Sequence, residues 1–117
     1  MAKIVGPTDV YKAFDDDGEI LYVGISYDAS ERLRQHRRSS RWWGMATWFE
    51  VDRYATREEA ENVEAASVMF DDPPFNIDPC GPAGRRVWAD IAAGVLNYPT
   101  LETHEFHASD LGWFRHG

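Results

Sequence analysis

The stretch of sequence that decides the fold is residues 22–36, Tyr-Val-Gly-Ile-Ser-Tyr-Asp-Ala-Ser-Glu-Arg-Leu-Arg-Gln-His. Its first residues are strand formers, and Gly24 interrupts them as glycine does where two backbones or a ligand approach closely. Asp28 or Ser30 can then cap a helix. The stretch therefore predicts the end of a strand, a turn and a helix.

The predicted helix brings two polar side chains together. Arg32 and His36 are four residues apart, so they project from one face of a helix, and Ala29 and Leu33 form its buried seam. A guanidinium and an imidazole near the start of a helix, beside Tyr22 on the preceding strand, suit a bound phosphate. This part of the chain is thus a candidate anion site.

Length and composition predict a single domain. The chain has 117 residues and 44% hydrophobic content, enough for one modest core. It contains no apolar run of about 18 residues that could span a membrane, and its N-terminus lacks the apolar core of a secretory signal. Cys80, the single cysteine, excludes an internal disulfide and a multi-cysteine zinc site. We expect a cytoplasmic protein without membrane contact.

The charge balance argues against a generally basic protein, because the formal net charge is -8. The positive charges are concentrated, however. No carboxylate occurs between residues 32 and 41, which contain Arg32, Arg34, Arg37, Arg38 and Arg41. A dense run of one sign can produce a local field that attracts nucleic acid, although a run of charges can also be a solvated helix face.

A β-hairpin is predicted before this helix. Residues 10–14 and 20–23 are apolar runs on either side of the turn-forming sequence Asp-Asp-Asp-Gly. If those turn residues form the loop, Tyr11 lies directly opposite Tyr22 and both phenols share one face of the sheet. The pairing then serves either a site or ordinary cross-strand packing.

A third strand is predicted over residues 46–55, which alternate between apolar and polar side chains. The connection before it contains Trp42 and Trp43. The two indoles either pack over the edge of the sheet or, together with Arg41, form a platform on which unpaired bases stack.

A second long helix is predicted to start at the capping-box sequence Thr-Arg-Glu-Glu of residues 56–59 and to run to about Phe70. Glu64 borders its buried stripe, because Ala60 and Val68 lie one turn away on either side. A carboxylate in that position needs a partner charge or a bound cation, unless it reaches solvent.

The rest of the chain is less regular. Asn76 follows two prolines and can bond a neighbouring backbone or serve a site. Residues 85–95 have helical spacing, and Pro99 ends that helix. We expect residues 79–117 to form a helical and irregular extension packed on the same domain, where it can contact a second copy or a partner protein.

Taken together, several of these pieces resemble the GIY-YIG nuclease family. They are Val10-Tyr11, Tyr22-Val23-Gly24, Arg32, Glu64 and Phe75-Asn76-Ile77, in that order and at these spacings. The resemblance covers roughly residues 10–77. It implies an α+β fold of β-β-α-β-α order with a three-stranded antiparallel sheet flanked by helices. The extra C-terminal helical segment lies outside the resemblance.

The resemblance also implies a residue set. The catalytic residues would be Tyr11, Tyr22, Arg32, His36 and Glu64, and the supporting residues Gly24 and Asn76. The nucleic-acid contacts expected from the arginine run are Arg34, Arg37, Arg38 and Arg41. The first motif departs from the family pattern, because it reads Asp-Val-Tyr without the glycine and isoleucine. Ile25 also stands where some members have a lysine, which removes one possible activator of water.

The implied activity is metal-dependent endonucleolytic hydrolysis of DNA. One or both tyrosines would bind or activate the attacking water, Arg32 would neutralise the phosphate, and Glu64 would hold Mg²⁺ or Mn²⁺. A tyrosine of ordinary pKa, about 10, is a poor base at neutral pH. We therefore expect Arg32 or the metal to lower the pKa of Tyr11 or Tyr22. His36 would shuttle a proton or bond the phosphate.

Two alternatives remain open from the sequence. One is a nucleic-acid-binding module of the same fold that cleaves weakly or not at all, in which Arg32 and Glu64 would not converge with the tyrosines. The other is an acidic accessory factor that binds a basic protein through its carboxylates. That factor would have no positive surface near residues 32–41.

Overall fold

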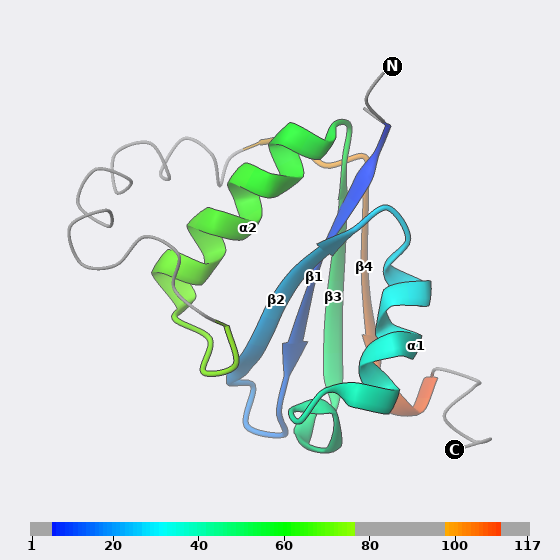
Figure 1. The fold of residues 1–117 in the computed structure, drawn as a ribbon, viewed down its shortest axis with the longest axis vertical. Coiled ribbons are helices and arrows are strands. Elements are labelled where there is room, and N and C mark those ends of the chain that lie inside the picture. The colour runs from blue at the N-terminus through cyan, green and yellow to red at the C-terminus, as the bar shows by residue number, and fades with distance from the viewer. Residues whose placement is uncertain (1–5, 77–97, 111–117) are drawn as a thin grey trace.

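The computed structural model describes residues 6–76 and 98–110, in which two helices flank one four-stranded sheet (Figure 1). All strand pairs are antiparallel, and the strand order is β2-β1-β3-β4. The elements in chain order are β1 (Thr8–Phe14), β2 (Ile20–Ser26), α1 (Ala29–Ser39), the 3-10 turn η1 (Trp43–Met45), β3 (Trp48–Tyr54), α2 (Arg57–Asp71), β4 (Glu102–His107) and the 3-10 turn η2 (Ala108–Asp110). The α+β class predicted from the sequence is confirmed.

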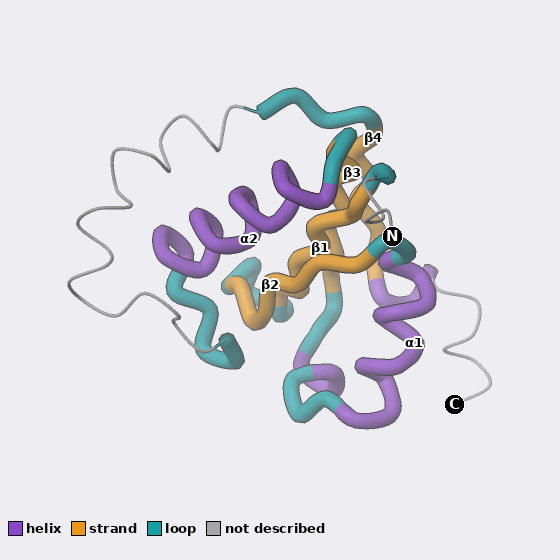
Figure 2. The backbone as a smooth tube through the Cα atoms, turned by 45° about the horizontal axis from the view of Figure 1, so that its top comes forward, coloured by secondary structure: helices purple, strands orange, loops and turns teal. Residues whose placement is uncertain are grey.

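The helices lie on opposite sides of the sheet, as the tube view shows (Figure 2). Neighbouring residues of a strand point to opposite faces, so each strand contributes to two cores. On the α1 side, Tyr11 and Phe49 pack with Leu33. On the α2 side, Val10 and Val63 belong to a second buried cluster. The sheet therefore presents the Tyr11 face to α1 and the Val10 face to α2.

α1 begins at Asp28, one of its two predicted caps, and α2 begins at the predicted cap Thr56. The side chain of Asp28 accepts a hydrogen bond from the backbone N–H of Glu31 at 3.2 Å, and that of Thr56 accepts one from Glu59 at 3.1 Å. These contacts satisfy backbone donors that the first turn of a helix leaves unpaired. The buried residues of α1 include the predicted seam of Ala29 and Leu33.

Asp9 fixes the start of α1 against the sheet. Its Oδ2 accepts a hydrogen bond from the backbone N–H of Ala29 at 3.0 Å, and its Oδ1 lies 2.8 Å from a guanidinium nitrogen of Arg53. Asp9 is buried, so the charge needs both partners. This carboxylate sets the position from which α1 projects its side chains over the sheet.

The hairpin has a different register from the predicted one. Tyr11 pairs with Gly24, and Tyr22 pairs with Ala13, not with Tyr11. The pairing is irregular between Ala13 and Phe14, and Asp15 Oδ1 accepts hydrogen bonds from the N–H groups of two later turn residues. The predicted direct pairing of the tyrosines is thus wrong. The register differs by two residues, so both tyrosines remain on one face, as predicted.

The sheet contains a fourth strand that the sequence did not indicate. Residues 102–107 pair with β3 and form an edge of the sheet, so the expected three-stranded sheet is wrong by one strand. The helix expected over residues 85–95 lies outside the described residues. None of the described helices is long and apolar enough to cross a membrane.

Candidate active site

Tyr11 occupies the centre of the site, and Gly24 makes room for it. Tyr11 is only 1% exposed, and its ring lies against the backbone of Gly24 on the paired strand. A Cβ atom at Gly24 would lie 2.9 Å from Cε2 of the ring and closer still to Cζ and the hydroxyl. The glycine is therefore required by the position of the phenol, as its place in the sequence suggested.

A chain of hydrogen bonds leads from Tyr11 into α1. The Tyr11 hydroxyl lies 2.8 Å from Nε2 of His36, and the other ring nitrogen of His36, Nδ1, contacts the hydroxyl of Ser40. Ser40 directly follows α1, one turn after His36. Sequence reasoning missed Ser40. Its spacing of four residues from His36 is the signal that could have indicated it.

His36 is neutral in this environment. Burial lowers the pKa of its imidazole to about 4, and the positive charge of Arg32 contributes to the decrease. The side chain is 5% exposed. A neutral imidazole has one N–H, so of its two contacts one accepts and the other donates. Tyr11, His36 and Ser40 therefore form a path along which a proton can shift.

Tyr22 lies beside this chain. Its ring centroid is 6.2 Å from that of Tyr11 and 5.1 Å from that of His36. Burial raises the pKa of Tyr11 and of Tyr22. The positive charge of Arg32 lowers both pKa values, as expected, but this effect is smaller than the effect of burial. Contrary to the expectation that Arg32 would activate them in this way, both side chains are protonated phenols at neutral pH.

The remaining two candidates flank the tyrosines. Arg32 is exposed on α1 and donates a hydrogen bond to Gln35 at 2.7 Å. Glu64 is half-buried on α2, and its charge acts on the pKa of both tyrosines. Each of the five predicted catalytic residues therefore interacts with at least one of the others, although they come from both helices and two strands.

Asn76 has a structural task in this arrangement. Its Oδ1 accepts a hydrogen bond from the N–H of Val23 at 2.9 Å, and its Nδ2 donates one to the carbonyl of the same residue at 2.8 Å. The side chain thus pairs with the free edge of β2 as a neighbouring strand would. Of the two roles left open for Asn76, the structure shows the bond to a neighbouring backbone.

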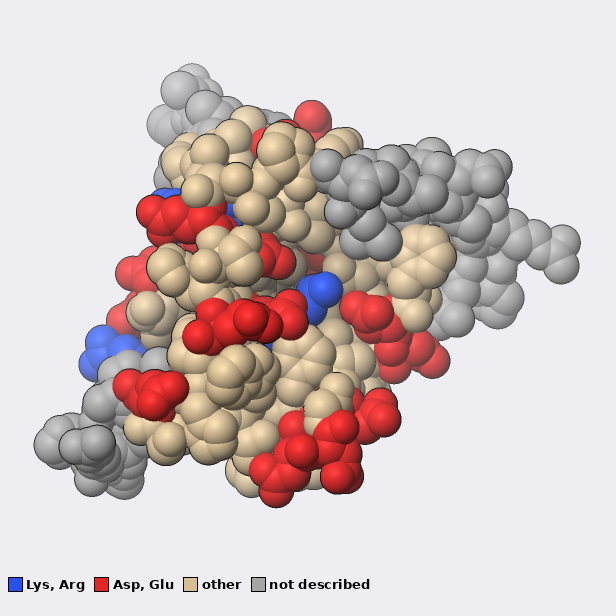
Figure 3. Space-filling model, turned by 180° about the vertical axis from the view of Figure 1, so that it is seen from behind, with Lys and Arg blue, Asp and Glu red and all other residues tan. Residues whose placement is uncertain are grey.

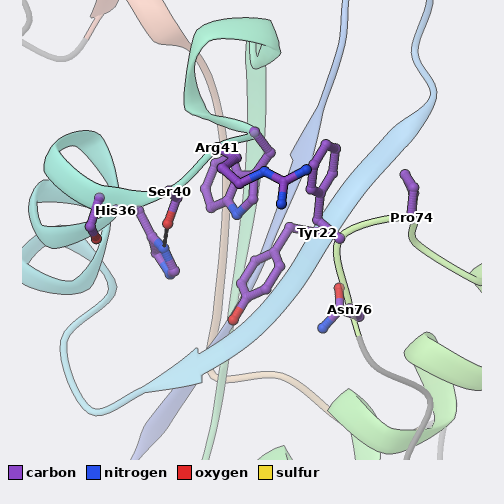
Figure 4. Close-up of a pocket in the computed structure, with 9 residues that line it drawn as sticks. Tyr22, His36, Ser40, Arg41, Pro74 and Asn76 are labelled. Atoms are coloured by element: carbon purple, nitrogen blue, oxygen red, sulfur yellow. Dashed lines mark hydrogen bonds between the residues drawn. The ribbon is translucent and has the colours of Figure 1, made fainter.

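A pocket of about 470 Å³ opens beside these residues. In Figure 4, Tyr22 and His36 line it from β2 and α1, Asn76 lies across from His36, and Arg41 extends over Tyr22. The ring of Trp42 stacks on Tyr22 with centroids 5.2 Å apart. The pocket is large enough for part of a ligand to lie next to the Tyr11–His36 chain.

The tryptophan pair packs in the core. Trp42 is 3% and Trp43 9% exposed, and Trp43 also packs against Phe49 with ring centroids 5.3 Å apart. The packing alternative for the two indoles is confirmed. Neither indole presents an open face to a nucleobase.

The arginine run lies on and just after α1. Arg34, Arg38 and Arg41 are exposed, and Arg37 is half-buried. Arg34 pairs with Glu31 at 3.0 Å, but both side chains are about half exposed, so solvent weakens the pair. The side of the molecule that carries Arg32 therefore also carries a local excess of positive charge.

The donor groups fit a magnesium ion held by a single carboxylate. Among residues 6–76 and 98–110, no group of three His, Cys, Asp or Glu side chains is arranged to enclose a metal. Mg²⁺ often binds through one or two carboxylates together with waters and substrate phosphate. Glu64 makes no hydrogen bond or salt bridge with another described residue, and burial raises its pKa more than the nearby charge of Arg57 lowers it. Such a carboxylate gains from a cation.

Comparisons with known proteins give no match. No protein-family model, no curated protein and no solved structure matches the chain significantly.

Proposed function

We propose that the protein is a metal-dependent endonuclease that hydrolyses phosphodiester bonds of DNA. The observation that carries the proposal is the buried Tyr11–His36–Ser40 chain beside a second tyrosine. A purely structural cluster has no need of an arginine and a carboxylate close enough for their charges to act on its tyrosines, as those of Arg32 and Glu64 do. The five residues together supply what hydrolysis of a phosphodiester requires.

Arg32 would bind the scissile phosphate. Its guanidinium is exposed, and it lies close enough to act on the pKa of Tyr11, Tyr22 and His36. Negative charge increases on the phosphate oxygens in the transition state, and a fixed cation stabilises it there. The neighbouring arginines of α1 would hold the flanking phosphates.

The Tyr11 hydroxyl would orient the attacking water. We assign its proton to the hydrogen bond with Nε2 of His36, so that the phenol oxygen acts only as an acceptor, toward the Arg32 side chain and toward the water. As the water attacks, its proton passes to the phenol oxygen while the phenol proton passes to Nε2. Nδ1 of His36 then donates to Ser40.

Binding of the substrate would strengthen His36 as a base. The positive charge of Arg32 is one of the two causes that hold the pKa of His36 at about 4. A phosphate bound to Arg32 cancels this charge, so the pKa of His36 rises when substrate is present. Without substrate, the imidazole of His36 is neutral and a weak base. With substrate bound, the same imidazole accepts a proton more readily.

Glu64 would hold Mg²⁺ or Mn²⁺. When bound, such an ion acts as a Lewis acid on a phosphate oxygen and stabilises the leaving group. The chain supplies only the carboxylate for this purpose, so waters and substrate oxygens complete the coordination.

Cleavage assays test the proposal. We expect the wild-type protein to nick supercoiled plasmid or cut a single-stranded oligonucleotide at low salt with Mg²⁺ or Mn²⁺, and EDTA to stop the reaction. Arg32→Gln should reduce the rate about 10²- to 10³-fold, as loss of one transition-state donor does elsewhere. Arg34→Gln removes a charge from the same helix and should reduce only binding. A folded wild-type protein that cuts neither substrate with either metal would contradict the proposal.

A further inference from the structure

A second pocket, of about 450 Å³, lies on the opposite face of the sheet from Tyr11. It forms where the β1–β2 turn meets the start of β3 and the end of β4. Its lining includes Phe14, Asp15, Asp16, Trp48, Glu50 and His107. We name it the indole pocket after Trp48. The proposed nuclease reaction does not use the indole pocket, so a role for this pocket is independent of that reaction.

The apolar part of the pocket is an exposed indole. Trp48 pairs across the sheet with Phe14 on one side and His107 on the other, so the three side chains form one row. The His107 ring meets the indole edge-on with centroids 6.2 Å apart. Trp48 remains 37% exposed, because α2 packs mainly on β2 and β1. Exposed tryptophans of this kind are common anchors in protein interfaces.

The charged part of the pocket is negative. Asp15, Asp16 and Glu50 line it, and Glu50 is half-buried without a salt bridge to any described residue. Lys12, which pairs with Glu50 across the sheet, has its salt bridge with Asp71 at 3.7 Å instead. The pocket therefore combines an aromatic surface with carboxylates that form no salt bridge with a described residue, although the charge of Lys12 acts on Glu50.

The surroundings have the same sign. Glu105 lies directly opposite Glu50 on β4, and Asp52 follows two residues later on the same face of β3. Burial raises the pKa of Glu50, the charge of Lys12 lowers it in part, and Asp52 and Glu105 raise it. On the side of the molecule seen in Figure 3, acidic side chains clearly predominate over Lys and Arg. A polyanion such as DNA would be repelled here.

We propose that the indole pocket binds an arginine side chain from a positively charged segment of a partner protein. The planar guanidinium can stack on the exposed face of Trp48 while its N–H groups donate to Glu50 and Asp15. This occupant is complementary both to the indole and to the net charge of -8. Because α1 lies on the other face of the sheet, such a partner leaves the arginine run accessible.

Nuclear magnetic resonance of the full chain tests the inference. The indole N–H signal of Trp48 is assigned from the spectrum of Trp48→Phe, and an arginine-rich peptide is then titrated in. The same peptide with neutral citrulline in place of arginine, and a single-stranded oligonucleotide, are titrated in parallel. We expect only the arginine peptide to shift the Trp48 signal in a saturable manner.

Two variants that each remove one negative charge test whether the peptide binds in the indole pocket. Glu50→Gln should weaken binding of the arginine peptide about two- to fivefold, as loss of one partly exposed ion pair does. Glu58→Gln changes the net charge equally on an exposed position near the start of α2 and should leave binding unchanged. The inference is overturned if the Trp48 signal does not respond, if citrulline or DNA shifts it equally, or if both variants weaken binding to the same extent.

Discussion

The neutral state of His36 predicts a specific dependence of stability on pH. The pKa of His36 is about 4 in the folded chain, against an ordinary value of 6.5. Protonation therefore favours the unfolded chain. The stabilisation is complete above pH 6.5 and is lost progressively as the pH falls toward 4. This depression of the pKa corresponds to about 3 kcal/mol at the acid limit, and to about 2 to 3 kcal/mol at pH 4.5.

His36→Gln isolates this contribution. Glutamine does not titrate, and its amide can bond both Tyr11 and Ser40. The free energy of unfolding is measured with urea at pH 7 and pH 4.5 for both proteins. Carboxylates titrate alike in the wild type and in His36→Gln, so their contributions to the pH dependence of stability cancel when the two proteins are compared. We expect the wild type to lose about 2 to 3 kcal/mol more than the variant over this interval. Equal losses would show that His36 is not held neutral by the fold and would refute the reasoning.

Two further substitutions test the packing around the site. Gly24→Ala forces a methyl group into the ring of Tyr11 and should reduce the free energy of unfolding by about 1 to 3 kcal/mol, whereas Gly44→Ala, which meets nothing within 4 Å, should change it little. Asn76→Ala removes both hydrogen bonds to the backbone of Val23 and should cost about 1 to 3 kcal/mol. Urea denaturation measures both effects, and unchanged midpoints for Gly24→Ala and Asn76→Ala would contradict the described contacts.

The helices could be predicted from the sequence because their signals are local. Asp28 and Thr56 cap helices through the backbone N–H three residues later. The apolar spacing that follows each cap is read over a few turns of helix. Neither signal depends on which strand or helix lies nearby, so both helices and the cap of the second were predicted correctly, and Asp28 is one of the two caps predicted for the first.

The hairpin register and β4 could not be predicted, because both depend on contacts made elsewhere. The two-residue difference in register arises from the irregular pairing after Ala13 and the turn organised by Asp15. β4 has a single partly buried side chain, Phe106, and hence no apolar alternation. Its strand conformation is stabilised by pairing with the edge of β3, which its own residues do not reveal.

The proximity of Tyr11, Tyr22 and His36 could be predicted from the sequence, but their protonation states could not. Tyr11, Tyr22 and His36 lie together as their spacing suggested. Their protonation depends on burial, however, which is determined by packing of residues distant in sequence such as Trp42. Burial outweighs the effect of Arg32 on both tyrosines. The sequence identifies Arg32 as a charged neighbour of the tyrosines, but it does not indicate how completely water is excluded from them.

Whether Glu64 serves a metal-dependent nuclease site is tested most directly by one comparison of cleavage rates. Glu64→Gln and Glu61→Gln remove equal charge from the same helix, but Glu61 is exposed and pairs with Arg57 at 3.6 Å. With Mg²⁺ and supercoiled DNA, the account predicts that Glu64→Gln loses about a hundredfold or more in rate and that Glu61→Gln cleaves like the wild type. Equal rates for the two variants would contradict it.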